Sequence, residues 1–371
     1  MVQIKKRILY LFSDTGGGHR SAASAIVKAV GTRAEQEMID VFAEGSKFLN
    51  VFAKLYAPVI KYSPKMWGML YYFLDNEKKL EQLEKISRPF ILDKFTKIIK
   101  TKKPDVIVSV HPLVNHLTVE AIKNTGLKIP FIVVITDPVT LHRAWITPKV
   151  DLCVVATEDA KKLAMKYGMP EKKIKVIGMP IHPKFADGPK NKEKIRKSEG
   201  LDPKVFTVLL MGGGEGAGGM YDIIKEIDRS QIKVQLIVIA GRNKTLEQKL
   251  ISEAGKFSFK VKVYGFTDKV DAIMSESDLI ITKAGPGTIA EALAMNLPII
   301  ITSWLPGQEE GNVRYVEQSK VGFTTRDPKR VVEIISNLQN TAVLNTIKKN
   351  ITKARKPNAA LDIADNIIKY L

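Results

Sequence analysis

The chain has 371 residues, of which 45% are hydrophobic and 26% charged, which is typical of a globular protein with two domains of moderate size. Its only cysteine, Cys153, excludes a disulfide framework and a cysteine-based metal cluster. The formal net charge is +19, and residues 1–185 carry +13 of it, so an anionic partner is expected: nucleic acid, or the anionic leaflet of a membrane. The alternative is that the lysines only form solvated surfaces, as in a lysine-rich proteome.

Short β-branched runs alternate with amphipathic segments of helical length through the first half of the chain, which is the pattern of strand–helix–strand units. The strands expected here are Ile8–Ser13, Glu37–Val41, Val106–Val110, Phe131–Ile135, Leu152–Ala156 and Lys175–Gly178.

One segment, Phe42–Phe73, interrupts this alternation and holds nine aromatic residues in 32 positions. Lysines recur among the aromatics, and Pro58 and Pro64 prevent one continuous helix. Aromatic rings beside ammonium groups suit a membrane interface, so this segment, with Trp67 and Tyr71, is expected to contact lipid or a lipid acceptor. The alternative is a helical excursion whose aromatics pack into the core of the first domain.

A polar, lysine-rich stretch at 186–203 is interpreted as a linker, and the strand pattern resumes after it. The strands expected in the second half are Val208–Met211, Val234–Ala240, Val261–Tyr264, Leu279–Thr282 and Pro298–Thr302. The last helical segment, 344–371, is interrupted at Pro357 and is expected to return toward the first domain.

These elements predict an α/β protein made of two Rossmann-like, doubly wound domains that face each other across a cleft. The first domain is placed at 1–185 and the second at 204–343. Ligands are expected at the carboxyl ends of the parallel strands. No stretch is apolar over the length of a membrane span, so the protein is expected to be soluble or peripheral.

Three glycine-rich turns each follow an expected strand and open a helix: Ser13–Arg20, Met211–Gly219 and Thr282–Thr288. Glycine lets backbone N–H groups approach a ligand, and a helix start favours an anion, so the three turns together indicate nucleotide binding. A nicotinamide enzyme is disfavoured because the strand after the second turn ends in Ala240–Asn243, without an acidic residue for a ribose. No P-loop sequence supports an ATP enzyme.

The third turn carries the most specific chemistry. The groups expected to donate hydrogen bonds to a diphosphate belong to Gly285, Gly287 and Thr288. Glu291 follows one helical turn later on the same face, where its carboxylate can accept both hydroxyls of a ribose. Gln308 and Glu309, after the next strand, supply the amide and carboxylate groups that suit a sugar.

Taken in order, these motifs closely resemble those of the monogalactosyldiacylglycerol synthases, in glycosyltransferase family 28 with the GT-B fold. The resemblance covers nearly the whole length and runs through 13–20, 111–116, 136–145, 178–181, 211–216, 241–243, 283–292 and 307–312. The first turn, Gly16-Gly-Gly-His19-Arg, is similar to the galactosyl branch, whereas related diacylglycerol glucosyltransferases usually carry an Asn-Tyr-Gly-Asn-Gly-His type of loop.

The resemblance implies that the C-terminal domain binds a UDP-sugar, with uracil near Gly265-Phe266, ribose on Glu291, diphosphate on Gly285–Thr288 and the sugar near Gln308 and Glu309. The N-terminal domain would hold diacylglycerol at the membrane, with His142 and Trp145 lining the acceptor site, although Trp145 also fits a plain core role. The full set expected to bind the donor is Gly17, Gly18, Gly213, Gly214, Arg242, Gly265, Phe266, Lys283, Gly285, Pro286, Gly287, Thr288, Glu291, Gln308, Glu309 and Asn312.

Transfer to a lipid hydroxyl needs a general base and stabilisation of the departing diphosphate. His19, with an ordinary pKa of ~6.5, is expected to be the base, and Asp137 is the alternative base or the partner that orients it. Lys283 or Arg242, together with the helix start, can neutralise the diphosphate, so no metal and no other cofactor is expected.

The activity expected is inverting transfer of galactose from UDP-galactose to 1,2-diacylglycerol, with anionic membrane lipids as partners and no nucleic acid. UDP-glucose is the alternative donor, followed by N-acetylglucosaminyl transfer to a lipid-linked acceptor. A non-catalytic basic protein would explain the charge but not Glu291, Gln308 and the glycine turns. Because the chain begins almost at its first strand, without the targeting extension of plant relatives, a bacterial enzyme peripheral to the cytoplasmic face of the membrane is expected.

Overall fold

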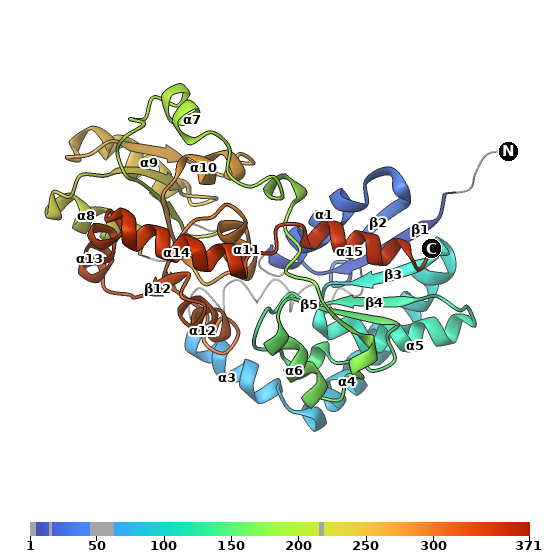
Figure 1. Ribbon diagram of the computed structural model, residues 1–371. Coiled ribbons are helices and arrows are strands. Elements are labelled where there is room, and N and C mark those ends of the chain that lie inside the picture. The colour runs from blue at the N-terminus through green and yellow to red at the C-terminus, as the bar shows by residue number, and fades with distance from the viewer. Residues whose placement is uncertain (1–4, 15–16, 45–62, 215–218) are drawn as a thin grey trace. The chain divides into compact units, whose positions relative to one another are not determined.

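The computed structural model describes residues 5–14, 17–44, 63–214 and 219–371 (Figure 1). Most of the aromatic and lysine-rich segment, 45–62, lies outside the described residues, as do parts of the first and second glycine turns, at 15–16 and 215–218. The described chain divides into two compact units. The first comprises Met1–Pro183, Leu305–Gly311 and Asn358–Leu371, and the second comprises Lys184–Trp304 and Asn312–Pro357.

The first unit is built on a parallel sheet of six strands in the order β2-β1-β3-β4-β5-β6. Its strands are β1 (Arg7–Phe12), β2 (Glu35–Asp40), β3 (Val106–Ser109), β4 (Phe131–Val134), β5 (Leu152–Val155) and β6 (Ile174–Val176). The central strands are buried along their whole length, which explains why they read as continuous apolar runs.

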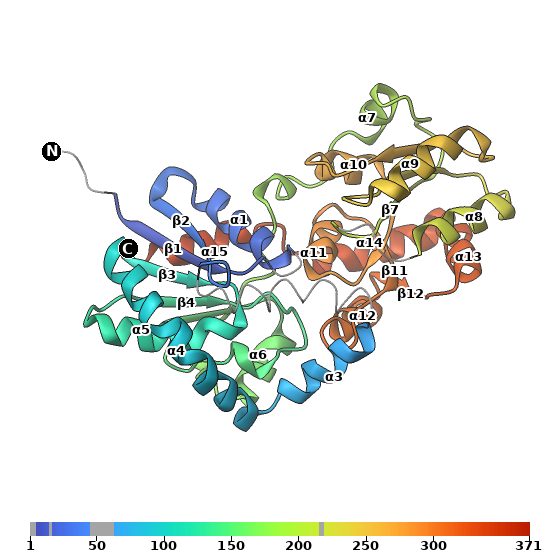
Figure 2. The same ribbon diagram turned by 180° about the vertical axis from the view of Figure 1, so that it is seen from behind.

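Helices cover both faces of this sheet (Figures 1 and 2). They are α1 (Gly18–Val30), α4 (Glu77–Lys102), α5 (Asn115–Thr125), α6 (Glu158–Lys166) and α15 (Ala359–Ile368). Helix α3 (Pro64–Leu74) lies away from the sheet and contacts α4 (Figure 1). Alternate residues of β1 enter opposite cores: Leu9 packs with α4 and α5, whereas Ile8 packs with α1 and α15.

The second unit is also built on six parallel strands, in the order β12-β11-β10-β7-β8-β9. Its strands are β7 (Thr207–Met211), β8 (Gln235–Ile239), β9 (Val261–Tyr264), β10 (Leu279–Lys283), β11 (Ile299–Ser303) and β12 (Gly322–Thr324). Read from β9, this is the 3-2-1-4-5-6 strand order of a dinucleotide-type doubly wound sheet.

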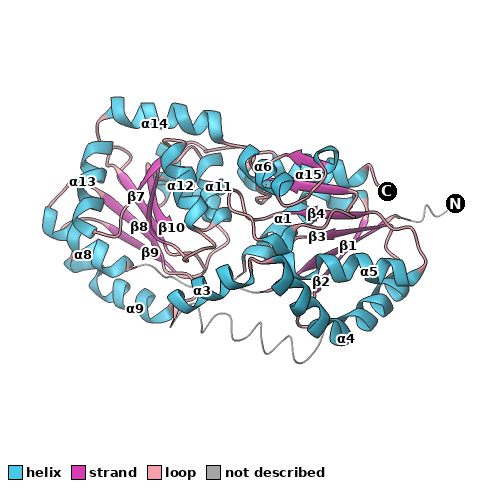
Figure 3. Ribbon diagram, turned by 90° about the horizontal axis from the view of Figure 1, so that it is seen from below, coloured by secondary structure: helices cyan, strands magenta, loops and turns pink. Residues whose placement is uncertain are grey.

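The helices of the second unit flank its sheet (Figure 3). They are α7 (Lys192–Ser198), α8 (Met220–Ser230), α9 (Lys244–Glu253), α10 (Val270–Glu276), α11 (Pro286–Ala294), α12 (Glu310–Gln318), α13 (Pro328–Leu338) and α14 (Thr341–Ala354). Helix α7 lies in the polar stretch at 186–203, where its Arg196 is buried and pairs with Asp278 at 2.5 Å. Pro357 lies between α14 and α15.

The predicted fold class, two parallel α/β sheets, is confirmed, and every expected strand is present with its ends within two residues of the prediction. The sequence prediction missed β12, an edge strand of three partly buried residues. A Cβ at Gly322 would lie 2.1 Å from the Ile299 carbonyl oxygen, so glycine is required for this pairing although it is a poor strand former. Among the described residues, no helix has both the length and the apolarity needed to cross a bilayer.

Candidate active site

Each sheet has one point at which the strand order reverses direction, and ligands of doubly wound sheets bind outside the carboxyl ends of the strands at that point. In the first unit the reversal lies between β1 and β3, and in the second it lies between β7 and β10. The loops after these four strands carry His19, His111, Gly213 and Gly285. The strand order and the sequence motifs therefore indicate the same four loops as the ligand-binding loops.

His19 lies in the first turn of α1, just after Gly17, whose φ of 79° is the left-handed conformation that glycine adopts most easily. Its Nδ1 is 3.2 Å from Oγ1 of Thr136, which follows β4. The ring of His111, which follows β3, packs edge-on against the His19 ring with centroids 4.7 Å apart. Three neighbouring strands thus bring these side chains together.

Both imidazoles of this cluster are neutral at physiological pH. Burial lowers the pKa of His19 to about 4, against the opposing effect of the Val110 backbone. Burial, and then the neighbouring His19, lowers the pKa of His111 well below its ordinary value. A neutral imidazole can accept a proton, which a general base must do.

Asp137 lies next to Thr136 and is held by Trp145, whose Nε1 donates a hydrogen bond of 2.6 Å to Oδ2 of Asp137. Burial raises the pKa of Asp137 to about 6; the Trp145 hydrogen bond opposes this rise and the nearby charge of Glu309 adds to it. Trp145 is completely buried, and its ring centroid is 6.0 Å from that of His19. It therefore supports Asp137 and His19 from the core.

Two further residues expected at the acceptor site, Tyr71 and His142, pack against each other with ring centroids 4.9 Å apart. Nδ1 of His142 accepts a hydrogen bond from the backbone N–H of Ala144, and burial lowers the pKa of His142. The Tyr71 hydroxyl is buried, and no described residue hydrogen-bonds to it. Trp67, partly buried, lies one helical turn before Tyr71 on α3.

In the second unit, Lys283 joins two of the glycine turns. Its Cε would be 3.1 Å from a Cβ at Gly213 and 3.5 Å from a Cβ at Gly285, so glycine at both positions leaves room for the lysine side chain. Gly285 is also the N-cap of α11, whose first turn has Pro286 and no acidic residue. The backbone N–H of Gly285 donates a hydrogen bond of 2.8 Å to the Lys283 carbonyl oxygen. An ammonium group beside the start of a helix forms an anion-binding arrangement.

Arg242, after β8, lies beside the second glycine turn and over an exposed ring. Its guanidinium is 3.3 Å from the position of a Cβ at Gly214 and 4.7 Å from the centroid of Phe266. Phe266 is 66% exposed, which is unusual for an aromatic residue and leaves a ring face open to a planar ligand. A Cβ at the preceding Gly265 would lie 2.7 Å from the Glu247 carboxylate, so the Glu247 side chain would have to move to admit a larger residue there.

Glu291 lies on α11, three residues after Thr288 and on the same helical face. Burial raises its pKa to about 7, and the charge of Lys184 opposes the rise. Lys184 Nζ also pairs with Asp271 at 3.0 Å. The carboxyl group of Glu291 is thus poised to change its charge near neutral pH.

The segment Leu305–Gly311 follows β11 of the second sheet but belongs to the first unit. Glu309 is buried, and its carboxylate accepts a hydrogen bond of 2.9 Å from the Leu305 backbone N–H. Asn312, whose role in donor binding stays a prediction, donates its side-chain amide to the Ala284 carbonyl oxygen at 2.9 Å. Asn312 therefore braces the loop before α11.

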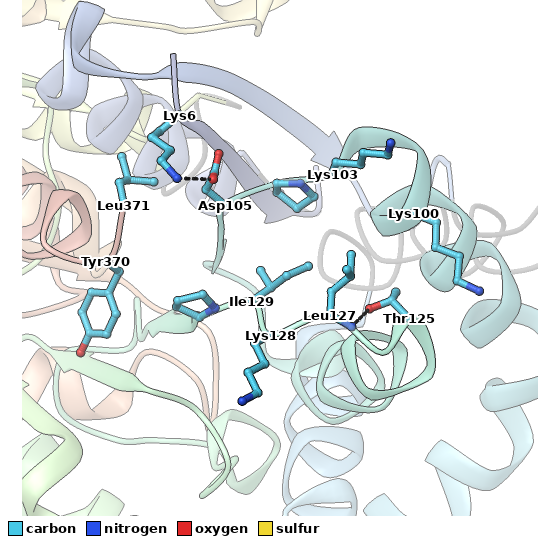
Figure 4. A pocket seen from close by; sticks show the side chains of 12 residues that line it. Lys6, Lys100, Lys103, Asp105, Thr125, Leu127, Lys128, Ile129, Tyr370 and Leu371 are labelled. Atoms are coloured by element: carbon cyan, nitrogen blue, oxygen red, sulfur yellow. Dashed lines mark hydrogen bonds and ion pairs between the residues drawn. The ribbon is translucent and has the colours of Figure 1, made fainter. Parts of the chain in front are cut away.

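A depression of about 750 Å³ lies at the opposite end of the first sheet, among residues that precede β1, β3 and β4 (Figure 4). Its lysines do not converge: the ammonium groups of Lys100, Lys103 and Lys128 point away from one another, and Lys6 pairs with Asp105 at 2.9 Å. This depression is at the amino ends of the strands and lacks the features of the candidate site.

Sequence reasoning did not assign roles to two residues that contact the site. Thr136 precedes Asp137 in a quoted motif, so its position at the end of an expected strand was an available signal. Lys184 is distant from Glu291 in sequence, and no local pattern links the two.

Comparison with known proteins shows the family of the chain. The family model described as monogalactosyldiacylglycerol (MGDG) synthase matches residues 19–181, and the glycosyltransferase family 28 C-terminal domain matches residues 207–367. A monogalactosyldiacylglycerol synthase from Spinacia oleracea is 35% identical over 98% of this chain and 72% of its own length. Monogalactosyldiacylglycerol synthase 3 from Arabidopsis thaliana is 36% identical over 98% of this chain and 81% of its own length.

Solved structures show the same fold at much lower identity. MurG from Acinetobacter baumannii has a TM-score of 0.62 at 15% identity, covering 98% of this chain and 99% of its own. Anabaena HepE in complex with UDP-glucose has a TM-score of 0.56 at 14% identity, covering 98% of this chain and 100% of its own. These structural similarities identify the fold as GT-B, and they do not identify the substrate.

Proposed function

Because the chain belongs to the monogalactosyldiacylglycerol synthase family of glycosyltransferases, we propose that it transfers galactose from UDP-galactose to the free hydroxyl of 1,2-diacylglycerol. The acceptor oxygen attacks the anomeric carbon as the bond to the UDP oxygen breaks, so an α-linked donor gives a β-galactoside. The observation that carries the proposal is the neutral His19, held by Thr136 at the carboxyl edge of the first sheet.

On the acceptor side, His19 takes the proton of the diacylglycerol hydroxyl as the new bond forms. This step places a positive charge on a buried ring, which is unfavourable without a nearby negative charge. Asp137 is assigned that role when it is ionised: it accepts a hydrogen bond from Trp145, whose ring centroid lies 6.0 Å from that of His19. In this account His19 is the base and Asp137 stabilises its protonated form.

On the donor side, the departing diphosphate lies at the start of α11, where Gly287 and Thr288 donate hydrogen bonds. Lys283 and Arg242 neutralise its charge from the neighbouring turns, so the proposal requires no metal. The carboxylate of Glu291 accepts the ribose hydroxyls, and uracil stacks on the exposed ring of Phe266.

The sugar is assigned to the segment that carries Gln308 and Glu309. Glu309 is close enough to Asp137 to raise its pKa, so a sugar held by this segment would lie beside the acceptor cluster. Galactose and glucose differ in the orientation of one hydroxyl. The names of the relatives favour galactose, and direct comparison of the two donors decides between them.

Diacylglycerol resides in bilayers, so the protein is proposed to bind a membrane surface from one side. The charge of +13 on residues 1–185 favours anionic lipids. Flotation with phosphatidylglycerol vesicles should recover the protein, and raising the salt concentration should reduce recovery. Equal recovery at low and high salt would contradict the electrostatic part of this proposal.

The role of His19 is tested by His19→Ala, with His116→Ala as the matched control. His116 is a partly exposed histidine of the same unit, on α5, and is not part of the cluster. Losing a general base should lower kcat by roughly 10²–10⁴-fold while the affinity for UDP is unchanged. If His19→Ala retains turnover close to that of His116→Ala, His19 is not the base.

A further inference from the structure

Helix α3 has one face that packs against the segment Leu305–Gly311. A Cβ at Gly68 would lie 2.8 Å from Cβ of Pro306, and a Cβ at Gly307 would lie 2.8 Å from the Tyr71 ring. The Tyr72 hydroxyl donates a hydrogen bond of 2.8 Å to Glu310. The helix and the segment therefore approach as closely as their glycines allow, immediately beside Gln308 and Glu309.

The opposite face of α3 is apolar and exposed. Its members follow the i, i+3, i+4, i+7 spacing of one helical stripe: Met66, Met69, Leu70 and Phe73, which are 52%, 74%, 44% and 55% exposed. We call these four residues the α3 stripe. A helix that is apolar on all sides is normally buried, so an exposed stripe of this length marks a surface that another apolar phase covers.

The surroundings of the α3 stripe favour a lipid bilayer as that phase. Lys65 and Lys78 are exposed near its two ends, and the ammonium group of Lys79 lies 3.2 Å from the centroid of the Phe73 ring. Apolar side chains bordered by lysines suit the boundary between acyl chains and anionic headgroups. The proposed acceptor, a diacylglycerol, is itself a component of that phase.

We propose that α3 links lipid docking to donor-sugar binding: lipid covering the α3 stripe stabilises α3 and so holds Leu305–Gly311 in place for the sugar. This inference rests on the proposed function, since it assigns the sugar to Gln308 and Glu309. Tyr72 is a positioning residue in this scheme, acting on the sugar through its hydrogen bond to Glu310.

The physical basis of this link is that lipid and sugar both favour the same state of the protein, in which α3 is ordered. Helix α3 has 11 residues, and a helix of that length is marginal in water without partners. Lipid on one face and the sugar-binding segment on the other both favour the ordered helix, so each raises the affinity for the other by the same factor. A coupling at the low end of the usual range corresponds to about fivefold.

The coupling is measured as the affinity of the full-length protein for UDP-galactose and for UDP, with and without phosphatidylglycerol vesicles that lack diacylglycerol. Vesicles should lower the Kd of UDP-galactose about fivefold and leave the Kd of UDP unchanged, since UDP lacks the galactosyl group that Gln308 and Glu309 are proposed to hold. Tyr72→Phe should abolish the gain while binding vesicles and UDP normally. Tyr221→Phe is the matched control, because the Tyr221 hydroxyl makes a 2.8 Å hydrogen bond to Glu253 elsewhere, and it should retain the gain.

A second variant, Met69→Gln with Leu70→Gln, keeps good helix formers while removing apolar surface from the α3 stripe. It should lose vesicle binding and the gain together, and it should sediment as the wild-type protein does. A change in oligomeric state, with vesicle binding retained, would instead make the α3 stripe a contact between copies of the chain and overturn the inference.

The remaining outcomes separate this inference from the proposed function. If UDP-galactose and UDP both bind but vesicles change neither affinity, or if Tyr72→Phe keeps the full gain, the link through α3 is wrong and the proposed reaction stands. If neither UDP nor UDP-galactose binds under any condition, both the donor assignment and the link are wrong.

Discussion

Replacing Trp145 by phenylalanine should move the acidic limb of the pH–rate profile to higher pH. In the wild-type protein, activity is expected to fall below a pH of about 6, where Asp137 becomes protonated and no longer stabilises a protonated His19. The Nε1–Oδ2 hydrogen bond of 2.6 Å favours the ionised form of Asp137. Without this hydrogen bond, the ionised form of Asp137 is less stable relative to the protonated form, so the pKa of Asp137 rises.

The size of the shift follows from the energy of that hydrogen bond. Hydrogen bonds to charged groups are worth about 1.5–3 kcal/mol, and one pKa unit corresponds to about 1.4 kcal/mol. A shift of about one unit, to a pH of about 7, is a conservative expectation because water can enter the space left by the indole. At pH 6 the ionised fraction would fall from about a half to about a tenth, and at pH 9 it would be unaffected.

The assay is kcat at saturating UDP-galactose across pH 5–9 on mixed micelles containing diacylglycerol, so that the pH dependence of donor binding does not contribute. The thermal midpoint of each variant is measured at every pH. Trp304→Phe is the matched control, because Trp304 lies after β11 and stacks on Arg326, 3.8 Å from the ring centroid. If Trp145→Phe lowers activity uniformly while its acidic limb coincides with that of Trp304→Phe, the role given to Asp137 is wrong.

Four further predictions concern the second unit. The affinity for UDP should fall about tenfold per pH unit below pH 7, since the ribose needs the ionised form of Glu291. Glu291→Gln should remove this pH dependence, and a wild-type affinity that stays constant from pH 5 to 8 would refute the role of Glu291. Phe266→Ala should weaken uridine and UDP alike by about 1–3 kcal/mol through lost stacking, and an effect on UDP alone would argue against base stacking. Arg196→Met should lower the free energy of unfolding by about 1.5–3 kcal/mol, because the buried Asp278 loses a charge-assisted hydrogen bond and keeps Lys192 as its cationic partner. Arg330→Met, in an exposed pair, should cost under about 1 kcal/mol. Turnover should survive exhaustive dialysis against EDTA, and a loss that Mg²⁺ restores would contradict the metal-free donor site.

The fold followed closely from sequence because its strands are buried on both faces. Such strands must be continuous apolar runs, as Val106–Ser109 and Leu152–Val155 are, and the alternating helices leave few other topologies. The exception, β12, is an edge strand whose pairing depends on close backbone contact at Gly322 rather than on a side-chain pattern.

The candidate site was predictable where it consists of loops that follow strands. His19, Gly285 and Glu291 lie where a strand end or a helix start positions them, and these are features that spacing reveals. Contacts that depend on tertiary packing were not predictable from spacing. The charge of Lys184 acting on Glu291 is one such contact.

The aromatic segment shows the same limit within a single helix. Trp67 and Tyr71 were expected to contact lipid or a lipid acceptor, and the structure places Tyr71 against His142 and Gly307. The exposed positions belong instead to the α3 stripe. Helical phase, which depends on where α3 begins, decides which residues face outward, and Pro58 and Pro64 in the sequence do not by themselves mark that start.

The most direct test of the central claim is a donor comparison on vesicles containing 1,2-diacylglycerol. UDP-galactose and UDP-glucose are supplied separately and in competition, and the lipid product is analysed by NMR for the sugar and its anomeric configuration. The account predicts a β-galactosyl diacylglycerol and a clear preference for UDP-galactose. Preferential formation of a glucosyl lipid, or an α-linked product, would contradict it.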